Sequence, residues 1–215
     1  MDTKGVSPYK DYGFPDANPS HMHRHFLPPL FELCGTLLKP NARVLDVGCG
    51  NGAAAGEFLA RGCQVVGIDL SESGIELARR TYPEGRFEMM AADDHVLEKL
   101  RCEPFDIVIS TEVIEHIYAP RPYVAGCYKA LRPGGRFICS SPYHGYLKNL
   151  AISVCNGWDR HANPLWDGGH IKLWSRRTLS ELLRDSGFAN LQFRGAGRLP
   201  FLWMTMLIAA DRPIE

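Results

Sequence analysis

The stretch VLDVGCGNG, residues 44–52, joins a short apolar run to three glycines at alternate positions. Its valines favour a strand, and glycine permits a tight turn with close backbone approach to a ligand. The small-residue segment GAAAGEFLARG, which begins at Gly52, predicts a helix whose N-terminus faces the same turn. The stretch therefore predicts a strand–turn–helix unit that can bind a ligand. A turn without a ligand is the alternative that this pattern alone leaves open.

The same order of strand and helix continues along the chain. Apolar, β-branched runs predict strands, and runs with helical spacing predict the helices between them. The predicted strands are 43–47, 64–70, 86–91, 105–110, one within 131–142, one near 188–196 and 199–210, and the predicted helices are 52–62, 71–82, 120–131 and 175–187. Strands that alternate with helices indicate an α/β fold with a mostly parallel sheet and helices on both faces.

The chain shows no internal repeat, low-complexity tract or linker, so residues 1–215 are predicted to form a single domain. Residues 1–40 are predicted to be an N-terminal helical cap, with a kink or start point at Pro28-Pro29. Residues 142–172 are predicted to be a lid insertion after the fifth strand. Apolar residues at helical spacing predict an amphipathic helix there, formed by Tyr146, Leu147, Leu150, Ala151, Val154 and Trp158. Two interpretations of this lid stay open: packing on its own domain, or cover over an apolar substrate with weak peripheral membrane contact.

Charge and cysteine content argue against several classes of protein. Lys plus Arg and Asp plus Glu each number 24, so the formal net charge is zero. This disfavours a nucleic-acid partner, which normally requires a basic excess. The N-terminal residues lack the apolar core of a signal peptide, and the longest apolar run, 199–210, is too short for a transmembrane segment. The seven cysteines form no CxxC pair, which indicates reduced thiols and a cytoplasmic location.

Acidic residues stand where the second and third predicted strands end. Asp69 ends the second strand in GIDLS, where a carboxylate suits the two hydroxyls of a ribose. Asp93 and Asp94 follow the third strand in AADDH.

Taken together, VLDVGCGNG, GIDLS, AADD, FDIVISTEVIEHI and LRPGGRF resemble the class I S-adenosylmethionine-dependent methyltransferases over roughly residues 40–210. The resemblance implies a Rossmann-like doubly wound sheet of seven strands in the order 3-2-1-4-5-7-6, with the last strand antiparallel. It also implies that S-adenosylmethionine is the cofactor.

The resemblance implies roles by position. Asp46 and the backbone of Gly48, Cys49 and Gly50 would hold the methionine end of the cofactor. Asp69 would bind the ribose hydroxyls and Leu70 would lie against the adenine. Asp93 and Asp94 would meet the adenine amine, and Ser110 and Thr111 would line the sulfonium side.

The segment EVIEH, residues 112–116, places two carboxylates and an imidazole directly after the apolar run FDIVIS. If the chain is helical from Glu112, then Glu112, Glu115 and His116 share one face, because i, i+3 and i+4 positions stack. Three interpretations compete: helix capping, general base catalysis by His116, and a metal site.

A fourth candidate ligand, His170, stands in HIKLWS. With EVIEH, this motif is similar to the small-RNA 3′-terminal 2′-O-methyltransferases, and EVIEHI is also similar to the ubiquinone-pathway O-methyltransferases. Both resemblances imply an acceptor with neighbouring oxygens, and the first implies that Glu112, Glu115, His116 and His170 bind Mg²⁺ or a similar divalent ion. We therefore predict catalytic roles for His116, Glu112 and His170.

The sequence predicts O-methylation of a small-molecule hydroxyl, on a catechol or vicinal diol that is apolar or lipid-linked. N- or C-methylation of a small metabolite and non-catalytic cofactor binding are the alternatives. The motifs indicate no oligomeric state.

Overall fold

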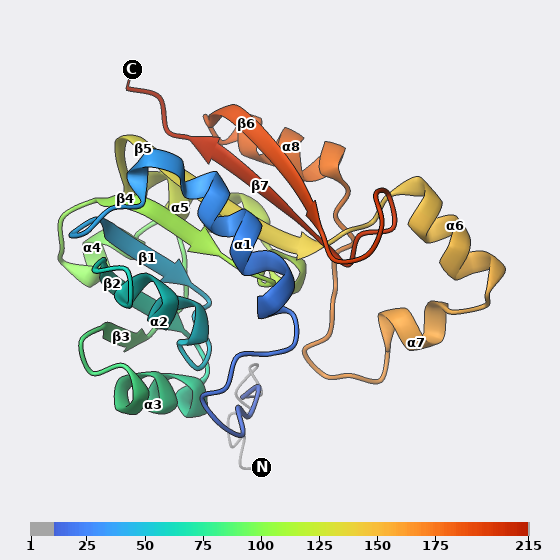
Figure 1. Ribbon diagram of the computed structural model, residues 1–215, viewed down its shortest axis with the longest axis horizontal. Coiled ribbons are helices and arrows are strands. Elements are labelled where there is room, and N and C mark those ends of the chain that lie inside the picture. Colours follow the sequence, from blue (N-terminus) through green and yellow to red (C-terminus); the bar gives the residue numbers. More distant parts are fainter. Residues whose placement is uncertain (1–10, 215) are drawn as a thin grey trace, which may run out of the picture.

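The computed structural model describes residues 11–214 and contains one mixed sheet of seven strands (Figure 1). The strand order is β3-β2-β1-β4-β5-β7-β6, which confirms the prediction. The first five strands pair in parallel, and β7 is antiparallel to both β5 and β6. The strands are β1 Arg43–Val47, β2 Gln64–Asp69, β3 Arg86–Met89, β4 Phe105–Ser110, β5 Leu131–Pro142, β6 Ala189–Ala196 and β7 Thr205–Asp211.

Helices cover both faces of this sheet. The helices are α1 His23–Cys34, α2 Ala53–Leu59, α3 Glu72–Thr81, α4 Val96–Leu100, α5 Pro120–Ala130, α6 Tyr146–Val154, α7 Trp158–Ala162 and α8 Arg176–Asp185, with 3₁₀ turns η1 Gly35–Leu37 and η2 Ile114–His116. One core cluster joins the sheet to α4, α5 and α8, and the other joins it to α1, α2 and α3. None of the helices in the described part of the chain has the length and apolar content needed to cross a membrane.

The strand order places β1 between β2 and β4, where the order of connections reverses. In open α/β sheets, ligands bind at the carboxyl ends of the strands beside such a reversal. Asp46 of β1 is paired in register with Gly67 of β2 and Ile109 of β4, so it lies at the centre of the sheet. The fold therefore indicates a ligand site at the loops that follow β1, β2 and β4.

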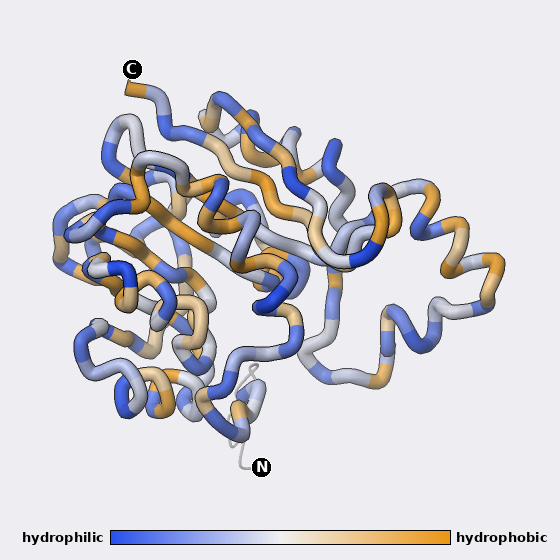
Figure 2. Tube along the Cα trace, in the orientation of Figure 1, coloured by the Kyte–Doolittle hydropathy of each residue, from blue (hydrophilic) through white to orange (hydrophobic). Residues whose placement is uncertain are grey.

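The segment between β5 and α8 extends away from the sheet and carries α6 and α7 (Figure 1). The sequence predicts an amphipathic helix here and leaves open what its apolar face contacts; in the structure Tyr146 and Val154 of α6 are 79% and 77% exposed, and Leu147 and Leu150 are about half exposed. Figure 2 shows apolar residues along α6 on this extended arm. Lys148, in contrast, is only 7% exposed. Trp158 begins the separate helix α7 and does not continue α6.

Candidate active site

A cavity of about 1860 Å³ lies at the carboxyl ends of β1, β2 and β4. The loops after these strands form its floor, and residues 11–23 and 166–171 form two of its sides. Tyr12 of the first side and Trp166 of the second are in edge contact, with ring centroids 6.1 Å apart. The cavity is therefore enclosed by segments that are far apart in the sequence.

The turn after β1 is packed too tightly for a side chain at Gly48 or Gly50. Gly48 has a φ of 78°, and a Cβ added there would lie 2.3 Å from Cγ2 of Val113. A Cβ on Gly50 would lie 2.5 Å from the ring of Phe14. The N–H groups of Gly48 and Cys49 donate to the carbonyl of Ile68 at 2.8 and 3.1 Å. Since these donors are already used, the turn is better suited to a ligand that itself donates hydrogen bonds, such as an ammonium group.

Asp46 lies beneath this turn and does not line the cavity. It is fully buried, and within residues 11–214 neither carboxylate oxygen has a hydrogen-bond partner. Burial, together with the nearby charge of Asp69, raises the pKa of Asp46 to about 7. A buried carboxyl without a partner is costly, and a cationic ligand at the turn would reduce that cost.

Asp69 lines the cavity at the end of β2. Its two oxygens accept hydrogen bonds from the N–H groups of Gly50 and Ser71 at 2.8 and 2.7 Å. A carboxylate has about four acceptor positions, so it can still accept bonds from two hydroxyls. Burial raises the pKa of Asp69. Leu70 lies beside it in the cavity wall.

Asp93 and Asp94 do not reach the cavity. Asp93 is paired with Lys99 and accepts a hydrogen bond from the N–H of His95, and Asp94 is paired with Lys129 at 3.4 Å. Met90, Ala91 and Ala92 line the wall in their place. The structure therefore does not bring these two carboxylates to the position that the sequence suggests, because lysines on α4 and α5 hold them outside.

The two residues expected at the sulfonium side differ in position. Thr111 lines the cavity, whereas the hydroxyl of Ser110 is buried and shares a 2.7 Å hydrogen bond with the hydroxyl of Tyr123. Tyr123 itself lines the cavity. The motifs could not indicate that Tyr123 and Phe14 line the cavity, because both residues come from segments outside the motifs.

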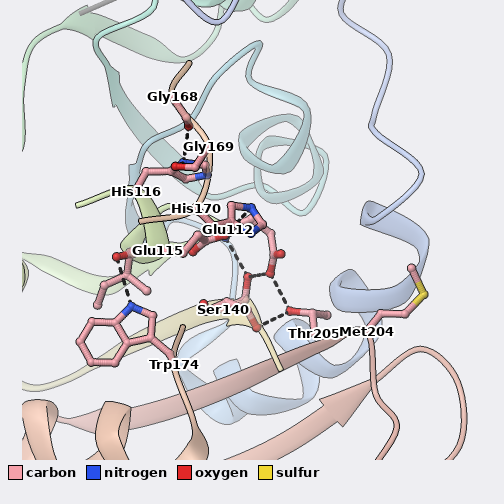
Figure 3. Close-up of polar contacts among 12 residues, drawn as sticks. Glu112, Glu115, His116, Ser140, Gly168, Gly169, His170, Trp174, Met204 and Thr205 are labelled. Carbon is pink, nitrogen blue, oxygen red and sulfur yellow. Dashed lines mark hydrogen bonds and ion pairs between the residues drawn. The ribbon is translucent and has the colours of Figure 1, made fainter. Parts of the chain in front are cut away.

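The chain is not helical from Glu112, so the condition for a shared helical face is not met. Glu112 has a φ of 56°, and the helical part is only the 3₁₀ turn Ile114–His116. The N–H of Glu112 donates to Oγ of Ser140 at 2.9 Å, and its Oε1 accepts from Oγ of Ser140 and Oγ1 of Thr205 at 2.7 and 2.6 Å (Figure 3). These bonds turn Glu112 toward β5 and β7, so it does not share a helical face with Glu115 and His116.

Glu115, His116 and His170 do converge. Their potential ligand atoms all lie within 4.8 Å of one another, and this group does not include Glu112. Nε2 of His170 lies 3.9 Å from Oε1 of Glu115, which is 1% exposed. In the described part of the chain, neither carboxylate oxygen of Glu115 has a hydrogen-bond partner. Three of the four predicted ligands are therefore placed where one cation could contact all of them.

Backbone contacts fix this group. Nδ1 of His116 donates to the carbonyl of Gly168 at 2.7 Å, which leaves the lone pair of the neutral ring on Nε2 (Figure 3). The N–H groups of Ile171 and Lys172 both donate to the carbonyl of Glu115 at 3.0 Å. The loop that carries His170 is thus attached directly to η2.

The electrostatics of the group favour a bound cation. Burial, and next the neighbouring Glu112, raise the pKa of Glu115 well above its usual value. Burial, and next the neighbouring His116, lower the pKa of His170 to about 4, so its ring is neutral at pH 7. Two imidazole rings and a carboxyl group without a hydrogen-bond partner in the described residues form a donor set typical of metal sites.

A family model described as a methyltransferase domain matches residues 20–193. The ubiquinone biosynthesis O-methyltransferase of Roseobacter denitrificans is 31% identical over 186 residues, which cover 80% of this chain and 70% of that protein. The protein of the same description from Thiobacillus denitrificans is 38% identical over 157 residues, which cover 71% of this chain and 67% of that protein.

Solved structures show the same fold. The 1,6-didemethyltoxoflavin-N1-methyltransferase of Burkholderia thailandensis, solved with 1,6-didemethyltoxoflavin and S-adenosylhomocysteine, superimposes with a TM-score of 0.61 and 24% identity. That match covers 86% of this chain and 77% of the other.

Proposed function

Because the chain belongs to the methyltransferase domain family and is an S-adenosylmethionine-dependent methyltransferase, we propose that it methylates a hydroxyl of a small-molecule catechol or vicinal diol. The observation that carries this proposal is the convergence of Glu115, His116 and His170 at one side of the cavity. The names of the curated relatives, which are O-methyltransferases, support oxygen as the acceptor atom.

The cofactor residues fit S-adenosylmethionine, which supplies the methyl group when it is bound. We assign the ribose hydroxyls to Asp69, since it lines the cavity and retains acceptor positions. We assign the methionine ammonium to the turn at Gly48–Gly50 above the partnerless carboxyl of Asp46. Leu70 and Met90–Ala92 provide the apolar wall for the adenine.

We assign a divalent ion to Glu115, His116 and His170, with three protein ligands where the sequence suggests four. Such an ion would lower the pKa of an acceptor hydroxyl and orient it. Two imidazoles and one carboxylate favour Mn²⁺, Fe²⁺ or Zn²⁺ over Mg²⁺, which prefers oxygen ligands. Glu112 is not one of these ligands, because Ser140 and Thr205 hold its carboxyl group.

His116 is also the candidate base if no metal takes part. The carbonyl of Gly168 holds its Nδ1–H, so Nε2 is the atom that would accept a hydroxyl proton. In the metal interpretation Nε2 of His116 binds the ion, and in the base interpretation the same atom accepts the proton. The two interpretations therefore predict different effects of a chelator on activity.

Methyl transfer from S-adenosylmethionine to 4-methylcatechol and to resorcinol, followed by mass spectrometry, tests the proposal. We expect product from the catechol and little from resorcinol, whose hydroxyls are not adjacent. Glu115→Gln should lose most of this activity, whereas Glu181→Gln, an exposed change on α8, should not. Cofactor binding without methylation of any catechol or diol, together with methylation of an amine, would overturn the proposal.

A further inference from the structure

Lys148 is buried although it lies on an exposed helix. It is 7% exposed, while Tyr146 and Val154 of the same helix face solvent. Lysines are rarely buried without a partner of opposite charge. Its Nζ donates to the carbonyl of Met204 at 3.3 Å, and within residues 11–214 no carboxylate forms an ion pair with it. Helix α6 thus brings the ammonium group of Lys148 to the cavity wall, together with Ala151 and Ile152.

Two other basic side chains line the same part of the cavity. His161 of α7 and Arg198 of the β6–β7 loop both contribute to its wall, as Lys148 does. Nε2 of His161 is buried and has no hydrogen-bond partner in the described structure. Burial, and next the charge of Arg198, lower the pKa of Lys148 to about 8, whereas the charge of Glu112 acts in the opposite direction. Three basic side chains therefore line one region of the cavity, and none of them forms an ion pair within residues 11–214.

The competing explanation is that Lys148 only offsets the charge of Glu112. Burial raises the pKa of Glu112, and the hydrogen bonds from Thr205 and Ser140 and then the charge of Lys148 oppose that increase. However, the hydroxyls of Ser140 and Thr205 already satisfy Oε1 of Glu112, and the ammonium forms no ion pair with it. This explanation also leaves His161 without a partner.

We propose that Lys148, His161 and Arg198 form a subsite for an anionic group of the methyl acceptor, so that the acceptor is a dihydroxy carboxylate. This inference rests on the proposed function, since it places the two hydroxyls at Glu115, His116 and His170. A carboxylate fits better than a phosphate, because Lys148 is the single buried charge among the three and matches a monoanion. His161 donates a neutral hydrogen bond, and Arg198 adds charge from the exposed rim.

The test compares 3,4-dihydroxybenzoate with 3,4-dihydroxybenzamide, which has nearly the same shape and no charge. Charged hydrogen bonds are strong enough that the wild type should prefer the carboxylate by about tenfold in kcat/KM. In Lys148→Met the preference should fall to about twofold or less, and Lys148→Arg should restore part of it. Lys39→Met, a change at an exposed lysine away from the cavity, should retain the wild-type ratio. Because each ratio is measured within one variant, partial loss of folded protein does not alter it.

Direct binding separates this inference from the proposed function. Calorimetry with the S-adenosylhomocysteine-saturated protein should show tighter binding of the carboxylate than of the amide in the wild type, and equal binding in Lys148→Met. If neither compound is methylated but this binding pattern is found, the proposed reaction fails and the subsite stands. Equal affinity of the wild type for the two compounds, or an unchanged ratio in Lys148→Met, would overturn the subsite.

Discussion

The buried carboxyl of Asp46 should make the stability of the cofactor-free protein depend on pH. In the folded state the pKa of Asp46 is about 7, raised by burial from an ordinary value of 3.8. A carboxyl whose folded pKa is raised contributes its full stability below the unfolded pKa, and this contribution is lost as the pH rises through the folded pKa. The window is therefore about pH 4 to 7, and stability falls as the pH increases.

The magnitude follows from the size of the shift. A difference of about 3 pKa units corresponds to about 4 kcal/mol of unfolding free energy, at about 1.4 kcal/mol for each unit. Asp46→Asn removes the titration and keeps nearly the same shape. Its amide, buried without a partner, costs about 1–3 kcal/mol at every pH. The stability of the variant relative to the wild type should therefore increase by about 2 kcal/mol between pH 5 and pH 7.

Urea unfolding of both proteins at half-unit intervals from pH 5 to pH 8 measures this difference. Asp159→Asn, at an exposed position on α7, is the matched control, and its unfolding free energy should depend on pH as that of the wild type does. Saturating S-adenosylmethionine should reduce the advantage of Asp46→Asn at pH 8, because the cofactor's ammonium stabilises the carboxylate form. The reasoning would be refuted if the difference in unfolding free energy between Asp46→Asn and the wild type did not change with pH. That result would mean that the folded chain already stabilises the ionised carboxyl of Asp46.

Three further predictions concern the cofactor turn and the ligand group. Asp69→Ala should weaken S-adenosylmethionine binding by about 1–3 kcal/mol in calorimetry, since the ribose loses a charged acceptor, while the melting temperature changes little. Gly48→Ala should destabilise the protein by about 2–4 kcal/mol in urea unfolding, because a Cβ would meet Val113, and adding Val113→Ala should recover part of that loss. Prolonged dialysis against a strong chelator should abolish catechol methylation, with recovery by Mn²⁺ exceeding that by Mg²⁺; activity unchanged by the chelator would leave His116 as a metal-free base.

Much of the fold could be predicted because its information is local. The run RVLDV and the glycines after it specify a strand and a turn without reference to distant residues, and FDIVIS specifies the adjacent strand by its apolar content. The strand order came from the resemblance of five motifs, not from these patterns. Asp69 could be placed for the same reason: it is the last residue of β2, and a parallel strand ends at the ligand side.

Asp93 and Asp94 could not be placed in this way. They follow β3 after a short irregular segment, so their direction depends on which charges lie nearby. Lys99 and Lys129 come from α4 and α5, and the pairing of side chains on separate elements is not visible in a linear pattern. The residues that do line the wall, Met90 to Ala92, carry no charge and give no functional signal.

Glu115, His116 and His170 lie close together although the helical arrangement used to group the first two with Glu112 is absent. The i, i+3, i+4 argument requires a continuous helix, but Glu112 is drawn to Thr205, 93 positions away, and its backbone becomes left-handed. Glu115 and His116 remain at the cavity because the 3₁₀ turn holds both of them beside the loop that carries His170. Their convergence thus depends on the backbone bonds from Ile171 and Lys172 to Glu115, and not on helical periodicity. It follows that shortening the loop 163–169 should separate His170 from Glu115 even though η2 itself is unchanged.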